Sequence, residues 1–232
     1  MPTPNSTTRV SVLIPALNEE DAIGAVIDEI PRPPVGEILV VDNGSSDRTT
    51  HVARERGARV VREERRGYGS ACLRGLAELG DTDIVVFLDG DHSDYPEELP
   101  ALIAPILDGE ADMVIGSRAL GERQRGALTP QQVHGNRLAC SLIRLLIGHS
   151  YSDLGPFRAI RCEALQSLKM TDTDYGWTVE MQIKAIRKGL RVTEIPVRYR
   201  RRIGRSKISG TISGTIKAGY KIILTILKHA RS

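Results

Sequence analysis

The sequence predicts an α/β fold with a mostly parallel central sheet and helices on both of its faces. In the first half of the chain, runs of consecutive apolar residues, such as 84–88, alternate with segments of helical periodicity. Strands that are apolar on both sides are typical of parallel sheets, which helices cover on both faces. Polar or acidic residues directly follow three of these runs, at the sheet edge where α/β proteins bind ligands.

Each apolar run bounded by polar or glycine-containing segments predicts a strand. The five strands of the first half are expected at 9–16, 37–42, 58–63, 83–89 and 111–117. The periodic segments between them predict helices at 19–30, 45–57, 69–80 and 96–109. We expect the prolines at 31, 33 and 34 to end the first helix, a Ser or Asp to cap the second, and Pro96 to lie in the first turn of the fourth.

The regular alternation stops after Arg118. A polar loop is expected first, and further helices and strands then complete the site. The loop is predicted at 121–130, helices at 131–148, 175–189 and 207–232, and strands close to 158–161 and within 191–202.

The composition is that of an ordinary soluble protein, with 41% hydrophobic and 26% charged residues. A net charge of +3 gives no reason to expect a nucleic-acid partner. The three cysteines are far apart, which argues against a disulfide framework and a zinc site and fits a reducing compartment. Because neither a signal peptide nor a membrane-spanning run is evident, we expect a cytosolic protein that could still lie against a membrane.

Asp89 and Asp91 follow the buried run 84–88 with one residue between them. Two carboxylates this close repel each other unless a cation neutralises them. Mg²⁺ or Mn²⁺ would satisfy both, because these ions bind carboxylate oxygens and share their other positions with substrate phosphates. The alternative is a turn whose acids are solvated or cap the helix at Pro96.

Together with "PALNEE" after the first strand and "VDNGSSD" after the second, this motif resembles the family-two glycosyltransferases, inverting enzymes of the type A fold that use nucleotide sugars. Within that family the chain looks most like the dolichyl- and polyprenyl-phosphate sugar transferases, of the dolichol-phosphate mannose synthase kind. The resemblance runs from Val10 to about Gly210. The segments that carry it are Pro15, Asn18, Glu19, Asp42, Gly44, Ser45, Asp47, Asp89, Asp91, 115–118, 153–161 and 201–207.

The resemblance implies a type A glycosyltransferase fold in one catalytic domain, 9–210. Residues 9–118 would bind the nucleotide sugar and residues 119–210 the acceptor. We expect residues 1–8 to be a disordered terminus and residues 211–232 to form an amphipathic helix.

The resemblance also implies which residues bind the donor. The base and ribose would contact Pro15, Leu17, Glu19 and Asp42, and a divalent metal on the diphosphate would be held by Asp89 and Asp91, with Ser93 contributing. For Asp42 a turn or cap remains an alternative. The donor is expected to be a UDP- or GDP-linked hexose.

Gly69 and Arg118 are two further candidates. In the family, glycines at the position of Gly69 let the loop approach the nucleotide, although a tight turn at a helix start explains this glycine equally well. The segment 66–75 lacks the third glycine of a dinucleotide-binding motif, which argues against a dehydrogenase. Arg118 would contact a donor or acceptor phosphate, unless it is a plain surface arginine.

The second half points to a phosphorylated acceptor. Family members that glycosylate a hydroxyl carry an aspartate as base, and that position falls on Thr178, which cannot accept a proton near neutral pH. An acceptor phosphate is already an anion and needs no base. Glu180, two residues on, is as well explained by a structural ion pair.

A short basic segment follows the last predicted strand and suits a phosphate clamp. The clamp would consist of Arg201, Arg202, Ser206 and Lys207, and a solvated or lipid-facing charge run is the alternative. Arg158 could join the clamp or stabilise a turn.

The C-terminal segment alternates apolar and lysine positions with helical spacing. Its apolar stripe is Ile212, Ile216, Tyr220, Ile223 and Leu227, beside Lys217, Lys221 and Lys228. It could rest on an anionic membrane surface, pack on the protein's own core, or form a homodimer. The apolar residues within 138–148 leave the same alternatives open.

These observations lead to one functional hypothesis. We expect a metal-dependent enzyme that moves a glucose or mannose from a nucleotide sugar to a polyprenyl phosphate with inversion, with Asp89, Asp91, Arg118, Arg201, Arg202 and Lys207 as its catalytic residues. A soluble hydroxyl acceptor, such as a sugar or phosphoglycerate, and a non-catalytic nucleotide-sugar-binding module are the alternatives. A separate membrane protein is a possible partner.

Overall fold

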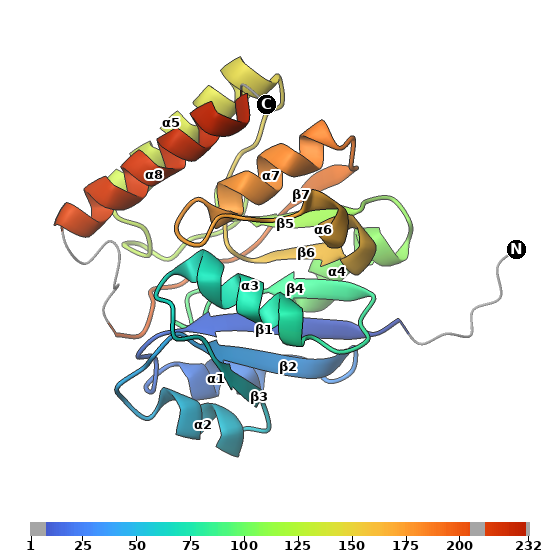
Figure 1. Cartoon of the computed structure of the whole chain (residues 1–232), viewed down its shortest axis with the longest axis vertical. Coiled ribbons are helices and arrows are strands. Elements are labelled where there is room, and N and C mark those ends of the chain that lie inside the picture. Colours follow the sequence, from blue (N-terminus) through green and yellow to red (C-terminus); the bar gives the residue numbers. More distant parts are fainter. Residues whose placement is uncertain (1–7, 205–211, 231–232) are drawn as a thin grey trace, which may run out of the picture.

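A computed structural model describes residues 8–204 and 212–230. Within them a seven-stranded sheet forms the centre of the molecule, in the order β3-β2-β1-β4-β6-β5-β7 (Figure 1). All strands run in the same direction except β6, which is antiparallel to both β4 and β5. The strands are β1 Val10–Ala16, β2 Val35–Asp42, β3 Arg59–Arg62, β4 Ile84–Phe87, β5 Met113–Ser117, β6 Arg158–Arg161 and β7 Val192–Pro196. The predicted mostly parallel sheet is confirmed.

The helices follow the predicted pattern with one addition, α6, which the sequence analysis lacks. This helix has seven residues and follows β6 directly, without an intervening loop that could mark its start in the sequence. The helices are α1 Ile23–Glu29, α2 Thr49–Glu55, α3 Tyr68–Glu78, α4 Leu99–Leu107 after the 3₁₀ turn η1 Pro96–Glu98, α5 Pro130–Ile147, α6 Cys162–Leu168, α7 Trp177–Arg187 and α8 Ile212–Ala230. The predicted disordered terminus lies almost entirely outside the described residues, as do residues 207–211 of the predicted last helix.

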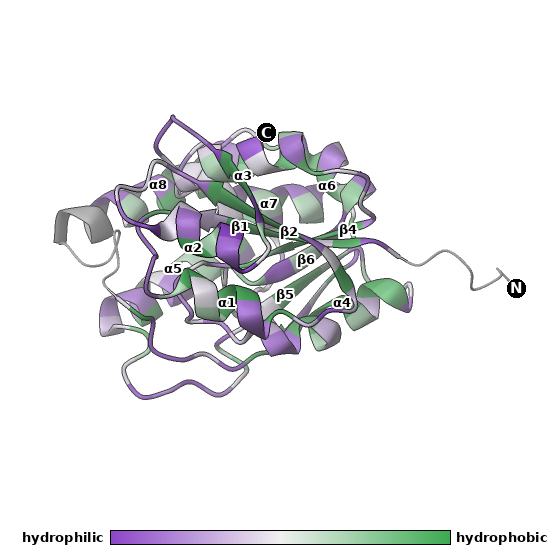
Figure 2. Cartoon of the chain, turned by 90° about the horizontal axis from the view of Figure 1, so that it is seen from below, coloured by the Kyte–Doolittle hydropathy of each residue, from purple (hydrophilic) through white to green (hydrophobic). Residues whose placement is uncertain are grey.

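The sheet separates two apolar cores, as its buried strands require. Alternate residues of β1 point to opposite sides, so that Val12 and Ile14 pack with α1, α2 and α4, whereas Leu13 packs with α3, α5 and α7. Figure 2 shows the hydrophobic strands between helices that carry both hydrophilic and hydrophobic residues. This two-sided burial holds the carboxyl ends of β1, β2 and β4 in register at one edge.

The loops after β1 and β2 bind each other, which explains why α1 and α2 begin four residues later than predicted. Asn18 has a positive φ of 53° and accepts a hydrogen bond at its side-chain oxygen from the amide of Ser46 (2.8 Å). In return, the amides of Asn18 and Glu19 donate to the hydroxyls of Ser45 (2.9 Å) and Thr49 (2.7 Å). These polar residues therefore link the two loops before either helix starts.

The two longest helices, α5 and α8, lie side by side on the α3 and α7 side of the sheet (Figure 1). Thr129 caps α5 with a capping box to Gln132, and Gly148 ends it with a φ of 80°. Among the helices described, none is both long enough and apolar enough to cross a bilayer.

The start of α3 packs closely against the loop before α7, so that there is no room for a side chain at Gly69. A Cβ atom there would lie 2.1 Å from the carbonyl oxygen of Asp172, whereas one at Gly80 would meet nothing within 4 Å. We therefore expect Gly69→Ala to lower the free energy of unfolding by about 2 kcal/mol through overpacking. Gly80→Ala is the matched control and should leave it nearly unchanged. Urea denaturation of both variants measures the difference, and equal midpoints would contradict this account of Gly69.

Candidate active site

A cleft opens at the carboxyl edge of the sheet, beside the ends of β1, β2 and β4. It joins the three polar motifs of the first half to the basic segment that follows β7. The predicted site residues that line it are Pro15, Leu17, Glu19, Asp89, Asp91 and Arg202. The fold thus brings together residues that are up to 187 positions apart in the sequence.

Asp89 and Asp91 lie at the floor of this cleft and have different surroundings. Burial and the charge of Asp91 raise the pKa of Asp89 to about 7, although the Tyr68 hydroxyl donates a hydrogen bond to its Oδ1 (3.2 Å). Asp91 accepts hydrogen bonds at Oδ1 from the amide and hydroxyl of Ser93. The raised pKa expresses the electrostatic cost of ionising both carboxylates without a cation.

The donor set fits a hard divalent cation. Asp89 and Asp91 offer carboxylate oxygens, the ligands that Mg²⁺ and Mn²⁺ prefer, in a site where added positive charge relieves repulsion. Residues 8–204 and 212–230 hold no group of three or more His, Cys, Asp or Glu that could bind a metal. Two aspartates would therefore have to share the ion with water and donor phosphates. The hydroxyl of Ser93 bonds to Asp91, so it orients that carboxylate.

Arg202 supplies positive charge to the same carboxylates. Its guanidinium contacts Asp91 Oδ2 and Glu19 Oε1, each at 2.9 Å. The backbone holds it there, because the amide of Ile203 donates to the carbonyl of Asp91 (3.0 Å). A metal ion that binds Asp91 therefore has to compete with the guanidinium of Arg202 for the same carboxylate.

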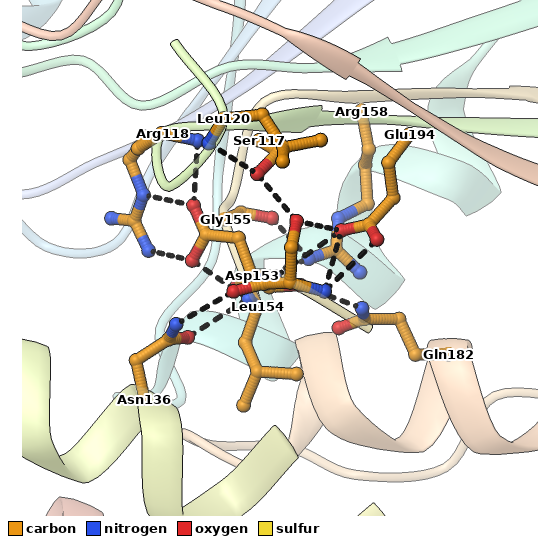
Figure 3. Close-up of polar contacts among 11 residues, drawn as sticks. Ser117, Arg118, Leu120, Asn136, Asp153, Leu154, Gly155, Arg158, Gln182 and Glu194 are labelled. Carbon is orange, nitrogen blue, oxygen red and sulfur yellow. Dashed lines mark hydrogen bonds and ion pairs between the residues drawn. The ribbon is translucent and has the colours of Figure 1, made fainter. Parts of the chain in front are cut away.

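Arg118 and Asp153 form a second charged centre, shown in Figure 3. Asp153 accepts hydrogen bonds from Arg118 Nε, Nη2 and the backbone amide, all at 2.8 Å. Although burial alone would raise it, this guanidinium holds the pKa of Asp153 below its usual range. Asn136 of α5 and Glu194 of β7 bond to the backbone around Asp153 (Figure 3), so the pair is held from several sides.

Residues 11–169 match the family Glycosyl transferase family 2. The chain belongs to this family.

The relatives of the glycosyltransferase include two that are named for lipid-phosphate substrates. A dolichyl-phosphate hexose transferase of Haloferax volcanii is 34% identical over 95% of each chain. An undecaprenyl-phosphate mannosyltransferase of Micrococcus luteus is 32% identical over 89% of this chain and 90% of that protein.

The fold of the glycosyltransferase matches that of glucosyl-3-phosphoglycerate synthase from Mycobacterium tuberculosis, a type A glycosyltransferase. That crystal structure contains Mn²⁺, UDP and glucosyl-3-phosphoglycerate, and it aligns with a TM-score of 0.79 and 30% identity over 97% of this chain and 80% of that chain. The type A fold is confirmed.

Five predicted site residues that the structure describes lie outside the lining of the cleft, and one of them is Ser93, which bonds to Asp91. Asp42 accepts a hydrogen bond from the amide of Ser45 (2.8 Å), the turn that was its alternative explanation. Gly69 faces the loop at Asp172, and Arg118 is bound to Asp153. Arg201 is exposed, and its Nε donates to the carbonyl of Arg125 (2.8 Å). Their contacts with substrate stay predictions, as do those of Ser206 and Lys207, which lie outside the described residues.

Two other residues of the glycosyltransferase have structural contacts. Glu180 is buried, forms an ion pair with Lys184 (2.7 Å) and accepts hydrogen bonds from the amides of Thr171 and Asp172, so the structural alternative holds. Arg158 is buried and donates to the carbonyls of Leu154 (3.4 Å) and Gly155 in the turn before β6, and to that of Thr178 in α7 (3.0 Å), which agrees with the turn-stabilising alternative.

Several residues around the cleft were not predicted. Asn43 donates to the carbonyls of Glu63 and Arg65 and accepts from the amide of Gly67, which shapes the wall formed by residues 63–67. Its position directly after Asp42 at a strand end was the signal that could have identified it. Other lining residues, Tyr68 and Tyr175, belong to helix-start segments without such a signal.

Asp94 is a further buried acid close to this site. Its carboxylate oxygens have no hydrogen-bond partner among the described residues, and the residue is 2% exposed. Burial, together with the charges of Asp89 and Asp91, raises the pKa of Asp94 well above its ordinary value. The surplus of carboxylates again favours added positive charge at this end of β4.

Removal of the Arg202 charge should strengthen metal binding in the absence of nucleotide. With Arg202→Gln, Asp91 loses its competing cation, so we expect the affinity for Mn²⁺ to rise on the order of tenfold. Mn²⁺ titration followed by electron paramagnetic resonance measures this directly. Arg201→Gln is the control, because Arg201 bonds to Arg125 instead. Unchanged or weaker binding by Arg202→Gln would contradict competition at Asp91.

The Arg118–Asp153 pair should contribute strongly to stability. Asp153→Asn leaves a buried guanidinium without its counter-charge, so we expect a loss of about 3 kcal/mol in the free energy of unfolding. Because folding lowers the pKa of Asp153, the wild-type advantage should be full near neutral pH and shrink as the pH falls below about 4. Urea denaturation across this pH range measures both effects.

The control for this stability measurement is Asp81→Asn, which breaks an exposed ion pair with Arg9. Exposed pairs contribute little, so its midpoint should match that of the wild type. Equal midpoints for Asp153→Asn and Asp81→Asn would contradict a stabilising role for the buried pair.

Proposed function

We propose that this glycosyltransferase moves a hexose, glucose or mannose, from a nucleotide diphosphate sugar to a polyprenyl phosphate, with a divalent metal and with inversion at the anomeric carbon. The observation that carries the proposal is the state of the acids lining the cleft. Glu19 and Asp91 are paired with Arg202, and Asp89 accepts from Tyr68. With Glu19 and Asp91 paired to Arg202 and Asp89 assigned to the metal, the proposal leaves none of these acids as a base toward a hydroxyl, whereas a phosphate acceptor is already nucleophilic and needs none.

The relatives support the same acceptor. Two proteins that align along most of their length are named for transfer to dolichyl or undecaprenyl phosphate. The absent base also agrees with Thr178, which stands at the expected base position and whose carbonyl binds the buried Arg158.

The proposed roles of the residues follow from their places. The nucleotide would bind along Pro15, Leu17 and Glu19, with Asp42 and Gly69 directly beside the lining residues Asn43 and Tyr68. Asp89 and Asp91 would hold the metal, which when bound stabilises the charge that develops on the leaving diphosphate.

The arginines would orient the two anionic reactants. Arg202 would contact phosphate, and Arg118, Arg201, Ser206 and Lys207 would complete the clamp on the acceptor. Inversion follows if the acceptor oxygen attacks the anomeric carbon opposite the leaving diphosphate. Positioning and electrostatics would supply most of the rate acceleration.

A soluble acceptor is the second candidate. The structural neighbour with a TM-score of 0.79 is a synthase whose crystal structure contains glucosyl-3-phosphoglycerate. The same neighbour contains UDP, which favours a uridine donor, and a GDP-linked donor is the alternative.

A direct assay separates the two acceptors. Radiolabelled UDP-glucose or GDP-mannose is incubated with Mn²⁺ and either a short polyprenyl phosphate or 3-phosphoglycerate, and the product is partitioned between butanol and water. We expect label in the organic phase with the lipid phosphate alone. Label only in water with phosphoglycerate would overturn the proposed acceptor.

Asp91→Asn should lower the rate on the order of 1,000-fold, because the metal loses a ligand.

A further inference from the structure

The helices α5 and α8 form one basic surface that the proposed chemistry does not use. Neither helix contains an aspartate or glutamate in its 18 and 19 residues. Both carry basic residues, which are Arg137 and Arg144 in α5 and Lys217, Lys221 and Lys228 in α8. Since the whole chain has 29 acidic residues among 232, their absence leaves both helices with basic residues only, and of these Lys221 pairs with Asp172 of a neighbouring loop.

The same helices expose large apolar side chains. Leu145 is 78% exposed, Tyr220 65% and Leu138 53%. They are three of the four most exposed large apolar residues in the described part of the chain, and the fourth, Leu120, is 56% exposed and lies elsewhere. Exposed apolar side chains together with basic ones, on helices lying side by side (Figure 1), are the combination by which amphipathic helices bind membrane surfaces.

We propose that the paired α5 and α8 helices dock the enzyme on an anionic lipid bilayer. The inference extends the proposed function, because a polyprenyl phosphate is carried in a bilayer. Charge complementarity favours lipid over a second copy of the chain. In a two-fold dimer the same surface would meet itself, so Arg137, Arg144 and Lys217 would face like charges.

The surface also has a physical connection to the acceptor half. Asn136 of α5 bonds to the backbone of Ser152 and Leu154, on either side of the Asp153 that holds Arg118. In α8, Lys221 forms an ion pair with Asp172 (3.1 Å), in the loop that leads to Tyr175 at the cleft. A bilayer bound at α5 and α8 would therefore lie next to elements that position both charged centres.

Vesicle sedimentation of the full chain tests the inference without donor or acceptor. We expect binding to vesicles that contain phosphatidylglycerol, little binding to pure phosphatidylcholine, and release at high salt. The triple variant Arg137→Gln, Arg144→Gln and Lys217→Gln should bind on the order of 100-fold more weakly, at roughly fivefold for each charge.

An apolar variant and two controls complete the design. Leu138→Ser with Leu145→Ser and Tyr220→Ser should also lose vesicle binding. The matched controls, Arg48→Gln with Arg54→Gln and Leu107→Ser with Leu120→Ser, change exposed residues elsewhere and should bind like the wild type.

Two results would overturn the proposal. One is vesicle binding that is absent or indifferent to lipid charge. The other is a dimer of the wild-type protein in light scattering that the surface variants convert to monomers, while their vesicle binding stays unchanged. That result would assign the surface to a second copy of the chain. Activity on a short, water-soluble polyprenyl phosphate should survive in the surface variants, so failure of docking is distinguishable from failure of the proposed reaction.

Discussion

Two buried carboxylates at the end of β4 repel each other, and much of the cleft is arranged around that repulsion. Tyr68 donates to Asp89, Ser93 orients Asp91, and Arg202 brings a positive charge to Asp91 from the other end of the domain. Burial and, after it, the charge of Asp91 still raise the pKa of Asp89 to about 7 in the presence of these partners. The remaining electrostatic cost is what a divalent cation on a donor diphosphate would relieve.

The second half of the chain closes this site through backbone pairing. After β7, the amide of Arg200 donates to the carbonyl of Ser93 (2.9 Å), and that of Ile203 donates to the carbonyl of Asp91. His92 contacts Glu29 in α1 at 2.9 Å, and the Arg200 guanidinium binds the same carboxylate. The Asp91 loop and the basic segment are thus bound to each other and to α1.

A separate charged pair, Arg118 and Asp153, joins the end of β5 to the loop before β6 and has a structural function. Asp153 binds Arg118 through three hydrogen bonds, and Asn136 and Glu194 fix the backbone around it. The Arg118 side chain held in this way would be preorganised to bind a phosphate, since it would lose little conformational freedom on binding. The same network anchors α5, so the helix surface and the charged pair belong to one rigid region.

The sequence alone determined those features that depend on residues adjacent in the chain, namely the strands and the residues at their ends. Apolar runs such as 84–88 identified the strands, and the two aspartates that follow them identified the site, because burial and strand ends have local signatures. The type A fold and the family followed from motifs at those strand ends.

Only the tertiary structure decided which of the candidate side chains meet. It placed Arg202, and not its neighbour Arg201, against Asp91, it paired Arg118 with Asp153, and it inserted the antiparallel β6 between β4 and β5. The physical reason is that such contacts join residues 35 to 111 positions apart, and their formation depends on packing across the sheet that no short stretch of sequence encodes.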